Sequence, residues 1–130
     1  MPELTGILES SLYVDDLSRS AVFYRMLFGF ETLVSEDRLC ALAVAGRHVL
    51  LLFKKGGSLD HVPPHGGSGQ LHIAFSIPEG DLAGWEARLT AAGVPIETHT
   101  HWELGGQSLF FRDPDGHLIE LVTSGCWGIY

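Results

Sequence analysis

Residues 108–122 read SLFFRDPDGHLIELV, two apolar runs on either side of a polar turn. The turn, Asp113-Pro114-Asp115-Gly116, places Pro and Gly where a tight hairpin requires them. The flanking segments 107–112 and 117–123 are therefore predicted to be neighbouring strands. Glu120 is out of place in the second of them, because a carboxylate among Leu, Ile and Val on a buried strand needs a compensating partner.

The hairpin is the end of a module that occurs twice in the chain. In the first copy, residues 7–14 (ILESSLYV) alternate apolar and polar side chains with period two, which indicates a strand. Asp16 or Ser18 can cap the helix that follows, and Gly29 ends it. The remaining strands of this copy are predicted at 30–35, 38–45 and 48–54.

The second copy repeats this order. Residues 70–77 (QLHIAFSI) alternate, and a helix is predicted from Asp81 to a stop at Gly93. Its other strands are predicted at 95–101, 107–112 and 117–123. The sequence thus predicts an α+β fold of two β-α-β-β-β modules within a single domain, residues 1–130. The modules span about 5–55 and 70–124, with a linker at 56–69 and an aromatic tail at 125–130.

The linker is rich in Gly and Pro and carries His61 and His65. A segment of this length without periodicity is long for a compact domain. Two interpretations stay open from the sequence: a plain connection between the modules, or a mobile flap over a site.

Composition limits the class of partner. The net charge is −8 with eight Lys and Arg residues in 130, and no basic run is longer than Lys54-Lys55. Nucleic acids and anionic membranes attract basic patches, so a small molecule or a protein is the expected partner. Cys40 and Cys126 have no metal-binding or redox spacing, and neither a signal peptide nor an apolar stretch of about 20 residues is present. We therefore expect a cytoplasmic protein.

Aligning the two modules by their strand patterns shows that Glu120 is one of four equivalent positions, two in each module. The first strands match Glu9 to His72, and the last strands match Leu50 to Glu120. If the apolar face of each first strand packs on its helix, Glu9 and His72 point to the opposite, concave face, which Glu120 can join. A divalent cation compensates two carboxylates, and two carboxylates with one imidazole leave positions open for substrate, as in catalytic sites.

Simpler interpretations of each residue remain open. Glu120 can pair with Arg112 or His117 across the hairpin, His72 can be a hydrogen-bonded histidine of a polar-faced strand, and Glu9 can be solvent-exposed. The aromatic tail can close the site or pack at a dimer interface. Alternation and the first of these placements indicate residues that line the concave face and contact substrate. They are Ser11, Tyr13, His48, Leu50, Ala74 and Trp127.

Three stretches carry a family resemblance: LYVDDLSRSAVFYRMLFGFE (12–31), LHIAFSIPEGDLAGWEARLTAAGV (71–94) and the hairpin 108–122. Together they resemble the vicinal oxygen chelate superfamily, also called the glyoxalase, bleomycin resistance and dioxygenase superfamily. The resemblance implies paired modules forming an incomplete barrel around a cleft, commonly in a homodimer. It also implies a divalent metal held by Glu9, His72 and Glu120.

The sequence departs from the family pattern at two positions. The first ligand is usually His or Gln, so Glu9 adds negative charge, which favours a harder ion. The expected cofactor is Mn, Fe(II), Zn or Ni. Leu50 occupies the position that is acidic in glyoxalase I, which argues against the four-ligand site of that enzyme.

The resemblance implies a small-molecule metalloenzyme, a lyase, transferase or dioxygenase in which the metal chelates neighbouring substrate oxygens. Glu9 or Glu120 is then the candidate general base. The alternative is a metal-free protein of the bleomycin-resistance type that binds and sequesters a drug, in which Glu9, His72 and Glu120 are polar lining.

Overall fold

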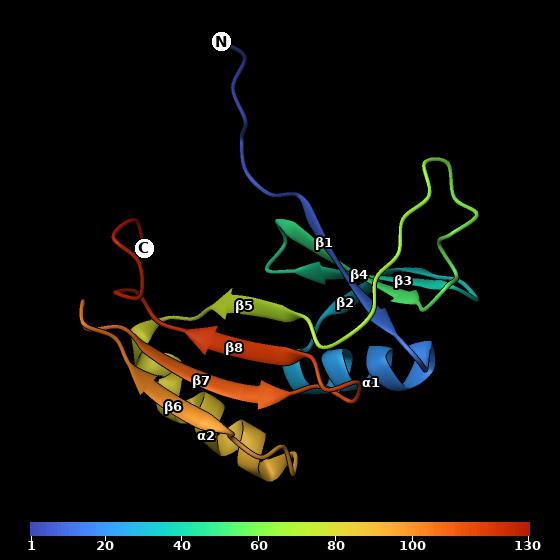
Figure 1. The fold of residues 1–130 in the computed structure, drawn as a ribbon. Helices are drawn as coiled ribbons and strands as arrows, with labels where there is room; N and C mark the ends of the chain where they lie inside the picture. The colour runs from blue at the N-terminus through green and yellow to red at the C-terminus, as the bar shows by residue number, and fades with distance from the viewer. The chain divides into compact units, whose positions relative to one another are not determined.

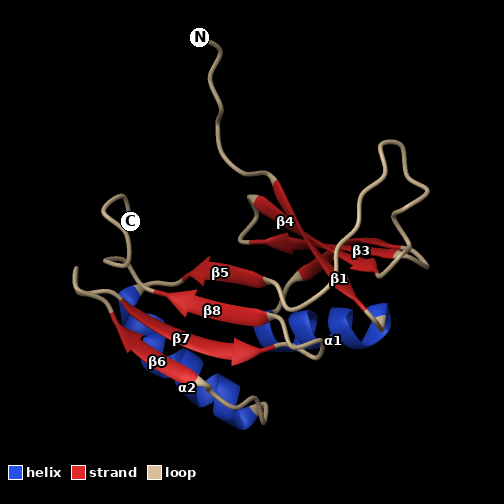
Figure 2. Ribbon diagram, in the orientation of Figure 1, coloured by secondary structure: helices blue, strands red, loops and turns tan.

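Each half of the chain forms one four-stranded sheet with one helix in the computed structural model, which describes residues 1–130 (Figures 1 and 2). The chain divides into two units, Met1–Ser68 and Gly69–Tyr130. The predicted α+β fold of two β-α-β-β-β modules is confirmed. None of the helices has the length and apolar character needed to cross a membrane.

The first unit contains one helix and four strands in the predicted order. They are β1 (Glu9–Val14), α1 (Leu17–Phe28), β2 (Glu31–Ser35), β3 (Leu39–Val44) and β4 (His48–Lys54). The strand order is β1-β4-β3-β2, with β1 parallel to β4 and the other pairs antiparallel. Asp16 caps α1 by accepting a hydrogen bond from the Arg19 amide at 3.0 Å, and Gly29 ends the helix with a left-handed φ of 72°.

The second unit repeats the topology. It contains β5 (His72–Ser76), a 3₁₀ turn η1 (Glu79–Asp81), α2 (Leu82–Ala91), β6 (Thr98–His101), β7 (Gln107–Arg112) and β8 (Leu118–Val122). The strand order is β5-β8-β7-β6, again with the first pair parallel. The predicted hairpin turn is present: the Gly116 amide donates to the Asp113 carbonyl at 3.0 Å, and Asp113 Oδ1 accepts from the amides of Asp115 and His117.

In both units the helix covers one face of its own sheet. Cys40 of β3 lies close enough to Arg25 of α1 for the guanidinium charge to act on the thiol, and Leu52 pairs with Cys40 and Leu12. These side chains therefore lie on the covered face, where Leu12 and Leu52 are almost fully buried. Each buried Leu contributes about 1.5–3 kcal/mol through loss of apolar surface from water.

In the second unit, too, the helix covers one face of the sheet and leaves the other uncovered by it. His99 of β6 lies 3.4 Å from Glu86 of α2, and it pairs with Leu109, which pairs in turn with Leu121. Leu109 and Leu121 are buried. We call the opposite face of each sheet its open face: in β1 it carries Glu9, as expected, and in β5 it carries His72.

The register of β1 against β4 differs by one residue from the register that the sequence alignment of the two units implies. Glu9 pairs with Val49 in the first unit, whereas His72 pairs with Leu118 in the second. The alignment made from the sequence instead requires Glu9 to lie opposite His48. A shift of one residue moves every side chain of a strand to the other face.

This register corrects the predicted partner of Glu120. Glu120 pairs with Ala74, and the matching pair in the first unit is Leu51 with Ser11. Leu51 is therefore the counterpart of Glu120, and the match to Leu50 is wrong. Since both are leucines, the first unit still has no acidic residue at this position.

The same shift changes the expected faces of two residues of β4. Leu50 is only 1% exposed and pairs with Ser10 and Leu42, so it packs on the α1 side and not on the open face. His48 lies two residues earlier and shares that face by alternation, and its Nδ1 donates a hydrogen bond to the Ile7 carbonyl at 2.7 Å.

Candidate functional site

Glu120 lies on the open face of the second sheet and is 7% exposed. Its two carboxylate oxygens have different partners. Oε1 accepts a hydrogen bond of 2.6 Å from the Ser108 hydroxyl, and Oε2 lies 3.1 Å from Nε2 of His72. The Ser108 hydroxyl of β7 thus donates to one oxygen of the buried carboxylate, and the His72 imidazole of β5 lies beside the other.

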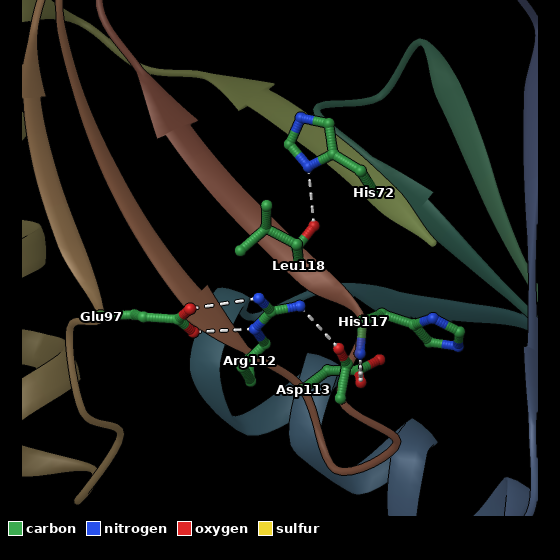
Figure 3. A network of polar contacts seen from close by, with 7 residues as sticks. His72, Glu97, Arg112, Asp113, His117 and Leu118 are labelled. Carbon is green, nitrogen blue, oxygen red and sulfur yellow. Dashed lines mark hydrogen bonds and ion pairs between the residues drawn. The ribbon is translucent and has the colours of Figure 1, made fainter. Parts of the chain in front are cut away.

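The His72 ring is held in one orientation. Its Nδ1 lies 2.9 Å from the Leu118 carbonyl oxygen (Figure 3). A carbonyl oxygen only accepts, so Nδ1 must carry the hydrogen. Nε2 is then the free ring nitrogen, and it points at Glu120 Oε2. Two acceptor atoms at this distance leave a place between them for a proton or a cation.

Ser108 and Trp102 are members of this site that the sequence did not predict. Trp102 Nε1–H donates to the Ser108 hydroxyl at 2.7 Å, and Ser108 donates to Glu120. The signal was available in the hairpin: counting back from the Asp113–Gly116 turn places Phe110 opposite Glu120, with Ser108 two residues further on the same face. Trp102 lies in a loop and offered no such signal.

The two simple pairings predicted for Glu120 are wrong. Arg112 binds both carboxylate oxygens of Glu97, at 2.8 and 3.1 Å (Figure 3). It also donates to the Gly116 carbonyl. The hydrogen bond from Arg112 holds the pKa of Glu97 below its usual value. His117 is buried and accepts a hydrogen bond from the Leu71 amide through Nδ1. Neither side chain pairs with Glu120.

Glu9 is the first residue of β1 and is exposed on the open face of the first sheet. Ser11 and Tyr13 share that face by alternation and are half-buried. Tyr13 contacts the linker segment, because its hydroxyl lies 2.9 Å from His65 Nδ1 and its ring lies against Gly67. Part of the linker thus packs on the open face of the first sheet.

The other predicted substrate contacts occupy varied positions. Ala74 is exposed on the open face of the second sheet, beside Glu120. Trp127 is 71% exposed in the C-terminal tail. The neighbouring Cys126 has a thiol whose pKa is raised by burial and by the negative charge of Glu120, so the tail lies near that carboxylate and the thiol stays protonated at neutral pH.

The pair of His72 and Glu120 fits a divalent cation. The separation of 3.1 Å between Nε2 and Oε2 is short enough for both atoms to bind one ion. The Leu118 carbonyl and the Ser108 hydroxyl hold the two ligands from behind, as outer-shell partners of metal ligands do. The structure gathers no group of three His, Cys, Asp or Glu side chains suited to a metal, so this pair provides two donors.

Known proteins resemble the chain over most of its length. The family described as the Glyoxalase/Bleomycin resistance protein/Dioxygenase superfamily matches residues 6–121. Metallothiol transferase FosB of Bacillus licheniformis is 33% identical over 122 residues, 93% of this chain and 77% of that protein. Glutathione transferase FosA of Serratia marcescens is 33% identical over 91% of this chain and 80% of that protein. Catechol-2,3-dioxygenase of Bacillus subtilis is 32% identical over 93% of this chain, which spans 42% of that protein.

A solved structure is similar across almost the whole chain. Lactoylglutathione lyase from Agrobacterium tumefaciens has a TM-score of 0.91 and 32% identity, and covers 98% of this chain and 99% of its own. Oxidase ChaP-H2, at 20% identity and a TM-score of 0.72, shares the fold over 93% of this chain and 94% of its own.

Proposed function

Because the chain belongs to the glyoxalase/bleomycin resistance protein/dioxygenase superfamily, we propose that it is a divalent-metal-dependent enzyme acting on a small oxygenated molecule. The observation that carries this proposal is the pair His72 Nε2 and Glu120 Oε2, 3.1 Å apart on neighbouring strands. Imidazole and carboxylate are donors that Mn(II), Fe(II), Zn(II) and Ni(II) accept. Such an ion, when bound, supplies Lewis acidity that stabilises an oxyanion of the substrate.

Glu9 is the proposed third ligand and general base. It occupies the position in β1 that His72 occupies in β5, and both lie on the open face of their own sheets. This assignment rests on the repeat and on the family pattern, and a Glu9 variant tests it. Ser108 and His72 engage both oxygens of Glu120, whereas Glu9 is exposed. Glu9 is therefore the carboxylate better able to take a proton from the substrate.

The charges of the second unit favour a substrate without a phosphonate group. Arg88 and Arg112 are its only Lys or Arg residues. Arg88 lies on α2, on the covered side, and Arg112 is engaged by Glu97 and Gly116. Metallothiol transferase and glutathione transferase are named for a thiol, and lactoylglutathione lyase is named for an acyl adduct of a thiol. We therefore propose reactions of small thiols or their adducts with oxygenated electrophiles as the first class to test.

Metal content tests the proposal. The protein is purified without chelator or nickel affinity and measured by inductively coupled plasma mass spectrometry. We expect about one ion per chain, lost in His72→Ala and Glu120→Ala and reduced in Glu9→Ala, because each variant removes a ligand. His101→Ala and Glu103→Ala remove the same side-chain types from exposed positions of the second unit and are expected to retain the ion.

Two results would contradict the proposal. One is a wild-type protein that binds no ion after incubation with Mn(II), Fe(II), Zn(II) and Ni(II), which would favour metal-free sequestration of a small molecule. The other is full metal content in His72→Ala and Glu120→Ala. If Glu9→Ala alone keeps full metal content, Glu9 is not a ligand, and the pair on β5 and β8 stands without it.

A further inference from the structure

A chain of two hydrogen bonds runs from a loop into the carboxylate of Glu120. The Trp102 indole N–H donates to the Ser108 hydroxyl at 2.7 Å, and the hydroxyl donates to Glu120 Oε1 at 2.6 Å. Ser108 is fully buried and Glu120 is nearly so. Water therefore has little access to replace either bond.

The chemistry of the groups fixes the direction of both bonds. An indole N–H can only donate, so the Ser108 oxygen must accept from Trp102. The single hydrogen of the hydroxyl is then directed to the carboxylate. The second bond is short, as expected for a hydroxyl that donates to a charged oxygen. Trp102 thus orients Ser108, and Ser108 orients Glu120.

The consequence is that the two oxygens of Glu120 have separate roles. Oε1 is held by Ser108, while Oε2 faces His72 Nε2 at 3.1 Å. Rotation of the carboxylate would break the bond to Ser108 and leave a buried hydroxyl without its acceptor, which costs free energy. The bond from Ser108 therefore selects Oε2 as the oxygen available to a ligand beside His72.

We propose that Ser108 and Trp102 are positioning residues that prepare Glu120 to bind a divalent cation through Oε2 alone, an inference that rests on the function proposed above. Neither side chain is a ligand. Both act through Glu120, in the way that the Leu118 carbonyl acts through His72. Loss of such outer-shell partners typically weakens metal binding by about 10–100-fold.

The test is the affinity for Mn(II), measured by the electron paramagnetic resonance signal of the free ion during titration. We expect Ser108→Ala to bind Mn(II) about tenfold more weakly than wild type, because Glu120 loses its orienting donor. Ser108→Thr keeps a hydroxyl and is expected to restore most of the affinity. Trp102→Phe keeps the ring and removes the N–H, and we expect a loss of roughly threefold, because it acts one bond further away.

The control is Ser76→Ala, which removes an exposed serine from the open face of the same sheet and is expected to bind Mn(II) like wild type. Thermal melts show which variants fold. If the extra methyl group of Ser108→Thr is not accommodated at the buried position, Trp102→Phe provides the second test.

The outcomes separate this inference from the function it rests on. Equal affinity in wild type, Ser108→Ala and Trp102→Phe would overturn the positioning role and leave the metal site in place. A wild-type protein that does not bind Mn(II) at all, nor any other divalent ion in the metal-content experiment, would overturn the metal site and the positioning role together.

Discussion

The two units share one topology but use their open faces differently. The second sheet carries a polar network in which Glu120 is bonded to Ser108 and lies beside His72. At the position equivalent to Glu120, the first sheet has Leu51. Near the other end of that face, Tyr13 packs against the linker through His65 and Gly67.

The comparison shows that two copies of one fold can share an apolar covered face and still differ in the side chains of their open faces. The covered face must be apolar in both, because it buries the helix and provides most of the stability. The open face is free of that demand, so one copy can hold costly buried polar groups while the other is mainly apolar. A buried carboxylate in both copies would need compensation twice.

The largest expected effect tests the register on which this comparison depends. Leu50 is 1% exposed on the face that α1 covers, whereas Leu51 lies on the open face and is half-buried. Leu50→Ala leaves a cavity and is expected to lower the free energy of unfolding by about 3 kcal/mol, and Leu51→Ala by about 1 kcal/mol. Urea denaturation measures both values. Equal losses, or a larger loss for Leu51→Ala, would contradict the assigned faces.

Most of the fold could be predicted from the sequence, because the features that determine it are local. Alternation located the strands, and the turn at Asp113–Gly116 separated the last two. The caps at Asp16 and Gly29 gave the limits of α1. The pairing register of β1 with β4 could not be predicted in this way. These strands are separated by a helix and two strands, so no turn fixes their register, and an error of one residue moved Leu50 to the wrong face.

The closeness of two candidate site residues could also be predicted. The pairing of His72 with Glu120 follows from two neighbouring strands of one sheet, and the structure brings these side chains together. The role of Glu9 as metal ligand and general base stays a prediction. Trp102 was missed because a loop residue has no periodicity from which its direction can be inferred.

A smaller effect is expected from the caps of the two helices. Asp16 accepts a hydrogen bond from the Arg19 amide in the first turn of α1, whereas Asp81 makes no side-chain cap at the start of α2. Asp16→Ala is expected to lower the free energy of unfolding by about 1 kcal/mol, and Asp81→Ala by much less. Chemical denaturation of both variants measures the difference. A loss in Asp81→Ala as large as that in Asp16→Ala would show that charge near the helix start, and not the hydrogen bond, is responsible.

The smallest expected effect concerns one exposed ion pair in each unit. Arg38 binds Asp60 in the first, and Arg112 binds Glu97 in the second. Hydrogen bonds from the guanidinium groups lower the pKa of both carboxyls. A lowered folded-state pKa contributes stability that is present above the unfolded value of about 4 and is lost as pH falls through the folded value. Solvent and salt screen exposed pairs, so both contributions are small.

Replacing each arginine distinguishes the two pairs. Arg38→Gln is expected to be less stable than wild type at pH 7, and the difference should vanish in acid, because the Arg38 side chain donates its hydrogen bonds to the titratable Asp60 carboxylate. Arg112→Gln should keep part of its difference in acid, because Arg112 also donates to the Gly116 carbonyl, which does not titrate. Urea denaturation from neutral to acidic pH, with carboxyl carbon NMR titration of Asp60 and Glu97, measures both. A difference for Arg38→Gln that persists in acid would mean that its side chain stabilises the linker by packing and not through the charge of Asp60.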